Sequence, residues 1–221
     1  MAFKKHILCF IALLLATLLT VQAQDQTPVG TFAGGVSVGG TATQISGDNL
    51  AGFHKLGATA GVFANCVLVE QPKFGLKLQM EMNFVMKGSH SYTPPSQTPN
   101  PMSKYILNLG YIEVPVLLRL RFARITIRNI SDFEFEVGPA FGVNIYARER
   151  DAYGIIVGRP AFKRWELSLM GGLSYKYKNH HIFTLRYSNS ILPVRKPDWA
   201  VYRPVKMQFN SVLYLIYSYQ F

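Results

Sequence analysis

The most constraining feature of the sequence is a strict alternation of apolar and polar side chains. It is clearest between Phe74 and Lys87, where Val85 is the only apolar residue on the polar face. A period of two residues is typical of a β-strand with two different faces, whereas a helix would spread the charges around its circumference. The apolar face of this segment carries Phe74, Leu76, Leu78, Met80, Met82, Phe84 and Met86.

The same alternation recurs along the chain and predicts eight strands. They lie at Val29–Gln44, Phe53–Leu68, Phe74–Lys87 and Ile106–Phe122, and in segments that begin near Phe133, Trp165, Phe183 and Phe209. In the Phe133 segment, Asn144 and Tyr146 fall on the polar face. In the Ile106 segment the phase is unclear before Tyr111, and we expect a β-bulge near Gly110.

Long connections alternate with shorter ones, as in a membrane barrel with long outer loops and short periplasmic turns. The long connections are Ile45–Gly52, Gly88–Ser103, Arg148–Lys163 and Ile191–Pro204. Alternation by itself is equally compatible with a soluble barrel that has an apolar lumen. Three features favour the membrane: uncharged apolar faces, polar faces rich in small residues, and aromatic side chains at strand ends. We therefore predict an all-β fold, an eight-stranded antiparallel up-and-down transmembrane β-barrel.

Residues 1–23 are typical of a cleaved signal peptide. Lys4 and Lys5 precede an apolar run from Ile7 to Leu19, and Val21-Gln22-Ala23 matches a cleavage site. The alternative, a transmembrane anchor, requires a longer apolar run. We expect residues 24–221 to form the barrel domain, exported to the bacterial outer membrane. Cys66 is then the only cysteine of the mature chain, so an intramolecular disulfide is excluded.

Several stretches resemble the PorT-like outer-membrane β-barrel family, in the family's order and over nearly all of the mature chain. They are ISGDNLAGFHKLGATAGVFANCVL, LKLQMEMNFVMKGS, YIEVPVLLRLRF, FEVGPAFGVNIYA and FTLRYSNSI. The closing strand ends in Phe221, as in outer-membrane barrels whose last residue is part of an assembly signal. The resemblance implies an eight-stranded barrel, in most members without an assigned activity. PorT itself is linked to type IX secretion.

An eight-stranded barrel is just wide enough for side chains to fill it. The alternation places a set of charged residues in this lumen, half of them acidic and half basic. They are Lys77, Glu81, Glu113, Arg119, Arg121, Glu134, Glu136, Glu166, Lys176 and Arg186. These charges could form an ion or proton path, or a plug of paired charges. We favour the plug, because the lumen leaves no room for a column of water and unpaired charges away from water are costly.

The sequence gives only weak support for a catalytic site or a metal site. His54 and His90 lie in or beside outer loops with serines nearby, but no spacing enforces the contacts that nucleophilic catalysis needs. His180 and His181 are adjacent in a predicted turn and do not form a ready metal site. We expect no catalytic residue, no metal and no cofactor.

The outer loops remain as the place for specific contacts. They carry a positive excess with interleaved aromatic residues, which could bind lipopolysaccharide phosphates or surface glycans, or could simply match an anionic leaflet. The candidate contacts are Arg148, Arg150, Arg159, Arg164, Arg195, Lys196, Trp199 and Arg203. The pI of about 9.7 is typical of nucleic-acid binding, but export to a membrane argues against nucleic acid. The expected partners are outer-membrane lipids and lipopolysaccharide, the barrel assembly machinery and envelope proteins.

Three functions follow as hypotheses. The first is a non-enzymatic barrel with a structural or interaction role through its basic outer loops. The second is a secretion or envelope-assembly factor of the PorT type. The third is a lipid-modifying or proteolytic enzyme at the outer rim.

Overall fold

The structure is a computed structural model, which describes residues 30–47, 52–71, 74–92, 104–122, 133–151, 153–156, 161–178, 180–197 and 207–221. The predicted signal peptide, residues 1–23, lies outside these ranges. Within them, no helix is both long and apolar enough to cross a membrane.

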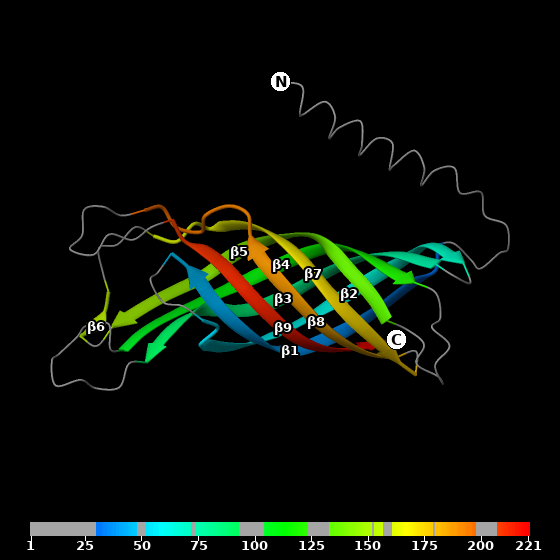
Figure 1. Ribbon diagram of the computed structural model, residues 1–221, viewed down its shortest axis with the longest axis horizontal. Coiled ribbons are helices and arrows are strands. Elements are labelled where there is room, and N and C mark those ends of the chain that lie inside the picture. The colour runs from blue at the N-terminus through cyan, green and yellow to red at the C-terminus, as the bar shows by residue number, and fades with distance from the viewer. Residues whose placement is uncertain are drawn as a thin grey trace, which may run out of the picture.

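Eight long strands form a closed antiparallel barrel, in which the strands run obliquely to the barrel axis (Figure 1). They are β1 (Phe32–Ser46), β2 (Lys55–Gln71), β3 (Phe74–Tyr92), β4 (Lys104–Phe122), β5 (Phe133–Asp151), β7 (Trp165–Tyr177), β8 (His181–Ser190) and β9 (Phe209–Gln220). A two-residue strand, β6 (Gly154–Ile155), pairs only with the end of β5. Each long strand pairs with the next along the chain, and β1 pairs with β9, which closes the sheet. The predicted fold class is confirmed.

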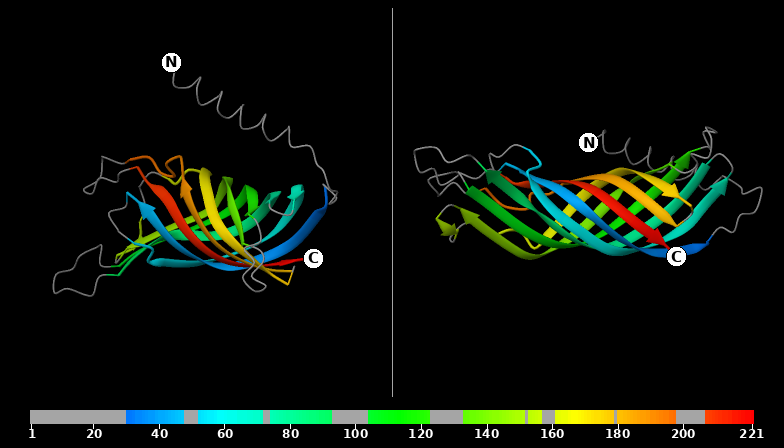
Figure 2. Two further views of the ribbon diagram at one scale, coloured as in Figure 1. Left: turned by 45° about the vertical axis from the view of Figure 1, so that its right-hand side comes forward. Right: turned by 90° about the horizontal axis from the view of Figure 1, so that it is seen from below.

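The sheet closes on itself because of the hydrogen-bonding needs of its backbone. In hydrocarbon, every amide and carbonyl needs a partner within the protein, and an open sheet would leave an edge unpaired. The long connections leave one end of the barrel, here called the outer end, and the turns leave the periplasmic end. Figure 2 shows both ends of the barrel from two further directions.

Three neighbouring strands are longer than the sequence predicted. β3, β4 and β5 have 19 residues each, whereas a tilted strand crosses a bilayer with about 9–11 residues. The connection expected to begin at Gly88 is wrong: the strand continues to Tyr92, and Gly88 accommodates this with a φ of 145°. Similarly, β5 continues through Arg148 to Asp151. The sheet therefore extends past the membrane at the outer end.

Side chains alternate between lipid and lumen as predicted over most of the sheet. The outward face is apolar and exposed, for example at Leu215, which is 67% exposed. The inward face is buried, for example at Met170, which is 1% exposed. At the periplasmic end of β8 and β9, outward aromatic side chains pack on one another, with Phe183 and Tyr217 ring centroids 5.4 Å apart. Such an aromatic girdle is typical of a membrane interface.

The bulge lies in β5, not in β4. The register passes from Gly110–Tyr146 to Tyr111–Asn144, so Ile145 is the extra residue. Along β4 the side chains alternate between lipid and lumen without a break. Leu107, Leu109 and Tyr111 all point inward and are fully buried. The predicted inward position of Tyr146 is wrong, because the bulge turns its side chain outward. A Cβ on Gly110 would lie 2.1 Å from this ring, so only glycine lets Tyr146 cover the strand there.

A charge on the lipid-facing side should prevent stable assembly. We expect Leu78→Arg to lower the free energy of unfolding by about 2–4 kcal/mol, because the guanidinium must enter hydrocarbon. Heat-modifiable gel mobility and urea unfolding in lipid vesicles measure this effect. Leu78→Met is the control, with an expected loss below about 1.5 kcal/mol. Equal stability of the two variants would show that Leu78 does not face lipid.

Candidate functional site

The periplasmic half of the lumen is filled by a network of paired charges, here called the periplasmic network. Its centre is Arg186 on β8, which reaches across the barrel to two strands. Its Nη1 and Nη2 donate to the two carboxylate oxygens of Glu81 on β3, both at 2.8 Å. Its Nε donates to Glu136 on β5 at 2.5 Å. Gln79 and Asn83 also donate to Glu81, each at 2.7 Å, so this carboxylate is fully engaged.

Further pairs extend the periplasmic network toward the rim. Arg119 Nε lies 3.1 Å from Glu134 Oε2, and Lys77 Nζ donates to Glu134 Oε1 at 2.6 Å. At the rim itself, Arg121 pairs with Glu70. These contacts join β2, β3, β4 and β5, so the network links strands on several sides of the barrel.

A second group of charges, here called the outer network, lies nearer the outer end. Lys87 on β3 is held between Glu113 at 2.5 Å and Glu166 at 2.7 Å, and its side chain is only 1% exposed. Tyr214 donates to the other oxygen of Glu113 at 2.9 Å, and Asn210 donates to Glu166 at 2.6 Å. One ammonium thus contacts one oxygen of each carboxylate, and polar groups of β9 donate to the other oxygen of each.

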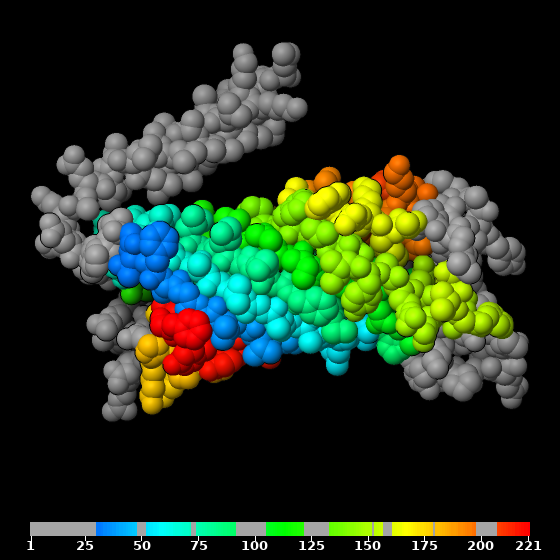
Figure 3. All heavy atoms as spheres, turned by 180° about the vertical axis from the view of Figure 1, so that it is seen from behind, coloured from blue at the N-terminus to red at the C-terminus, as the bar shows by residue number. Residues whose placement is uncertain are grey.

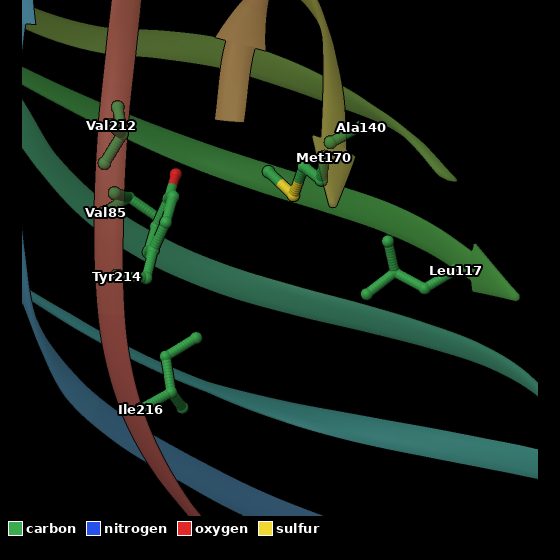
Figure 4. Close-up of a cluster of buried hydrophobic side chains, with 7 residues drawn as sticks. All are labelled: Val85, Leu117, Ala140, Met170, Val212, Tyr214 and Ile216. Atoms are coloured by element: carbon green, nitrogen blue, oxygen red, sulfur yellow. The ribbon is translucent and has the colours of Figure 1, made fainter. Parts of the chain in front are cut away.

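An apolar belt separates the two networks. Along β4, Leu117 lies between Glu113 of the outer network and Arg119 of the periplasmic network. The belt consists of Val85, Leu117, Ala140, Met170, Val212, Tyr214 and Ile216, which Figure 4 shows together in the lumen. Among the described residues, no ion pair links one network to the other. The lumen therefore contains two groups of paired charges with a cluster of apolar side chains between them.

Apolar side chains also pack together at the outer end of the lumen. Ile45, Tyr105, Leu107, Leu109 and Tyr111 form a buried apolar cluster, here called the outer plug, with two loop residues packed against it. Those loop residues are Ile156 and Phe162.

Arg195 holds the loop residue Phe162 close to Glu149 of β5, beside the outer plug. The Arg195 guanidinium lies 4.6 Å from the centre of the Phe162 ring, and its Nη2 donates to Glu149 Oε2 at 3.1 Å. Tyr105 donates to the other oxygen of Glu149 at 2.7 Å. The backbone amide of Lys163 donates to the Val194 carbonyl at 2.7 Å, which joins two outer connections.

The structure brings the predicted lumen charges together. All ten lie on inward-facing positions, and nine of them form the ion pairs described above. The tenth, Lys176, interacts electrostatically with Glu134.

Sequence reasoning missed four members of these clusters. Lys87 could have been found, because it falls on the polar face of its strand. Glu70 and Glu149 could not, because bulges change the phase of their strands, near Val67 in β2 and at Ile145 in β5. Arg195 was expected in an outer loop and instead reaches into the barrel mouth.

The predicted outer contacts divide into three groups. The prediction for Arg195 is wrong, because its side chain is 2% exposed and pairs with Glu149 inside the mouth. Exposed at the outer end are Arg148, Arg150, Arg164 and Lys196. Outside the described residues are Arg159, Trp199 and Arg203.

Among the described residues, His90 does not share a face of β3 with the serine next to it in sequence. His90 and Ser89 point to opposite sides of β3, and Ser89 is buried in the lumen. His181 Nδ1 lies 2.8 Å from the Tyr217 hydroxyl, and His180 stacks on Tyr219 with ring centroids 5.8 Å apart, so both take part in the aromatic girdle. Within the described ranges, no group of three His, Cys, Asp or Glu could hold a metal ion.

The sequence model of the outer membrane protein beta-barrel domain matches residues 22–194, more than three quarters of the chain. The chain belongs to this family. It is therefore an outer-membrane β-barrel protein of the bacterial outer membrane, in agreement with the closed sheet and its apolar outer face. Curated protein sequences gave no match.

Three solved structures resemble this outer-membrane barrel. Ail of Yersinia pestis, solved with the heparin analogue sucrose octasulfate, is 11% identical over 86% of this chain and 99% of its own, with a TM-score of 0.42. Neisserial surface protein A is 12% identical over 86% and 97%, with a TM-score of 0.42. OprG of Pseudomonas aeruginosa is 12% identical over 86% and 94%, with a TM-score of 0.34. These likenesses support no conclusion about function.

Removing the central cation of the outer network should be strongly destabilising. We expect Lys87→Met to lower the free energy of unfolding by about 3–5 kcal/mol, because two buried carboxylates lose their partner. Urea unfolding of the refolded barrel measures the loss.

The control is Lys178→Met in an exposed turn, with an expected change within about 0.5 kcal/mol. The triple variant Lys87→Met/Glu113→Gln/Glu166→Gln should recover part of the loss, since it removes the stranded charges. A loss at Lys87 as small as that at Lys178 would contradict a buried, paired ammonium.

Releasing Arg195 should open the outer connections without unfolding the barrel. We expect Arg195→Ala to increase the rate of trypsin cleavage at Lys163 about tenfold, because a charged hydrogen bond worth about 1.5–3 kcal/mol is lost. Mass spectrometry of timed digests measures the rate, and unchanged heat-modifiable mobility shows that the barrel persists. Lys196→Ala, the exposed neighbour, should leave the rate unchanged. Equal rates in both variants would show that the contact with Glu149 does not hold the loop.

Proposed function

We propose that this outer-membrane barrel is a non-enzymatic protein with a structural or interaction role. The single observation that carries the proposal is the apolar belt between two networks of paired charges. An ion or solute crossing the lumen would have to break ion pairs in both networks and pass the apolar side chains of the belt. The barrel is thus suited to be a rigid, closed support for its two ends.

Rigidity is supported by the way the ion pairs connect the strands. Arg186 alone joins β8 to β3 and β5, which are not its neighbours in the sheet. Contacts of this kind resist flattening or opening of the cylinder, because separating any two walls exposes a buried charge. A fixed cylinder holds the outer connections at defined positions above the membrane.

The closed lumen is tested by conductance. We expect the purified protein in planar lipid bilayers to give no unitary channel currents, and proteoliposomes to show no swelling in sugar solutions, because side chains fill the interior. A porin prepared in the same way is the positive control. Stable currents in proportion to the amount of barrel inserted would overturn the proposal.

The proposed partners are the molecules that meet the two ends and the outer face. Lipids and lipopolysaccharide would contact the apolar surface and the exposed arginines of the outer end. The barrel assembly machinery would recognise the last strand with Phe221, whose ring is exposed and packs edge-on against Tyr219 at 5.9 Å. Envelope proteins would bind the outer connections or the periplasmic turns. Crosslinking in intact cells, followed by affinity purification and mass spectrometry, would identify them.

A secretion or envelope-assembly factor of the PorT type remains the second candidate, supported by the resemblance of five stretches of the sequence to that family. Crosslinking separates it from the first, because such a factor would be recovered with a defined protein partner. The lipid-modifying form of the enzyme hypothesis predicts altered lipid A when the gene is deleted. Unchanged lipid A by mass spectrometry would remove that hypothesis.

A further inference from the structure

The outer end of β5 presents two arginines side by side on its outward face. Ile145 is the extra residue of the bulge, and it reverses the phase of the strand beyond it. Without it, Tyr146, Arg148 and Arg150 would continue the inward series of Glu134 and Glu136. With it, all three face outward and are exposed. Arg148 and Arg150, here called the arginine stripe, are two residues apart and therefore about 7 Å apart along the strand.

The stripe lies just beyond the hydrocarbon. The outward positions of β3, β4 and β5 form rows across the sheet, because the strands are paired in register. The row Phe84–Ile112–Val143 is apolar, and the next row, Met86–Gly110–Tyr146, ends in an aromatic side chain. The following rows are Gly88–Asn108–Arg148 and His90–Ile106–Arg150. The change from apolar through aromatic to basic places the arginines at the level of lipid head groups.

A second pair of aromatic side chains lies on the periplasmic side of the stripe, because Trp165 pairs with Val143 in the row next to that of Tyr146. Trp165 on β7 stacks on Phe141 of β5, with ring centroids 5.2 Å apart. Both are outward and exposed, and Arg164, also exposed, directly precedes Trp165. The amphipathic ring of tryptophan favours the interface between acyl chains and head groups. In Figure 3 the outer part of β5 and β6, in yellow-green, forms part of the barrel's lateral surface toward the outer end.

The acidic residues near the stripe are engaged elsewhere. Glu149, between the two arginines in sequence, points inward and binds Tyr105 and Arg195. The Asp151 carboxylate accepts the backbone amides of Tyr153 and Gly154 in the turn to β6. Among the described residues, no ion pair involves Arg148 or Arg150. The stripe therefore offers two guanidinium groups to a ligand from outside.

We propose that Arg148 and Arg150 form a binding site for the phosphate groups of a phosphorylated glycolipid in the outer leaflet, with Tyr146 beneath them against the lipid. The proposal depends on the proposed function in one respect: the end of the barrel with the long connections must face the outside of the cell. Planar guanidinium groups bind phosphate through paired, charge-assisted hydrogen bonds. The stripe faces sideways into the leaflet, so a membrane lipid reaches it more readily than a molecule approaching from above. Lipid bound in this way would orient the extended sheet of β3, β4 and β5 in the membrane.

Native mass spectrometry of the refolded full barrel in detergent micelles tests the site. The probe is lipid A with two phosphates, compared with the same lipid after removal of both phosphates and with inorganic phosphate alone. We expect the wild-type barrel to bind the phosphorylated lipid. Arg148→Gln/Arg150→Gln should bind it about ten- to a hundredfold more weakly, since each lost charge-assisted contact weakens binding.

The control variant removes two positive charges elsewhere on the protein. Lys178→Gln/Lys196→Gln loses two exposed lysines, one in a periplasmic turn and one in an outer connection, and should bind as the wild type does. Heat-modifiable mobility verifies that each variant folds. Arg148→Lys/Arg150→Lys keeps the charge but loses the planar geometry, and should bind about threefold more weakly.

Equal binding by the wild type and the Arg148→Gln/Arg150→Gln variant would overturn the site. Equal binding of the dephosphorylated lipid would overturn phosphate recognition, and equally strong binding of inorganic phosphate would overturn the assignment to a lipid. An equal loss in the lysine control would show that only net charge matters. None of these results tests whether the lumen is closed. Channel currents in the bilayer experiment, in turn, would contradict the closed lumen but not the lipid site at the arginine stripe.

Discussion

The absence of water in the hydrocarbon of a membrane governs this structure. Each backbone amide and carbonyl needs a partner, and a closed ladder of eight strands leaves no open sheet edge. Closure at this strand number leaves an interior only as wide as the side chains that fill it. Charged groups in this space are buried, and a buried charge is costly unless it is paired. The ion pairs from Arg186 to Glu81 and Glu136 are a consequence of the same constraint that closes the sheet.

The arrangement of charged and apolar side chains in the lumen has the same cause, since a buried charge needs a partner. Glu113, Lys87 and Glu166 pair with one another as a unit, and the charges around Arg186 pair separately. Between them, Leu117 and Met170 fill space that no polar group could occupy without a partner. Each network crosses several strands, so each contributes to keeping the cylinder closed. This arrangement suits a support and not a channel.

The bulge at Ile145 links the closed mouth to the lateral surface. By reversing the phase of β5, it sends Glu149 inward to Tyr105 and Arg195, and it sends Arg148 and Arg150 outward. Strand alternation separates this acidic side chain from its two basic neighbours in sequence, and the extra residue decides that the acidic one faces the lumen. Gly110 on β4 makes room for the Tyr146 ring where the phase changes. The outer end of this barrel depends on that local irregularity.

The sequence by itself determined the barrel, its approximate strands and the ten lumen charges, because a period of two with one uncharged apolar face has few physical solutions. It did not determine which charges pair, because the partners of Arg186 lie 105 and 50 residues away in sequence. Nor did it place the bulge: around Tyr111 both faces of the strand are apolar, so either phase fits the pattern. Only the folded sheet decided these points, since the extra residue shows only in the pairing of β5 with β4. That pairing turned Tyr146, Arg148 and Arg150 outward and Glu149 inward, where Arg195 binds it.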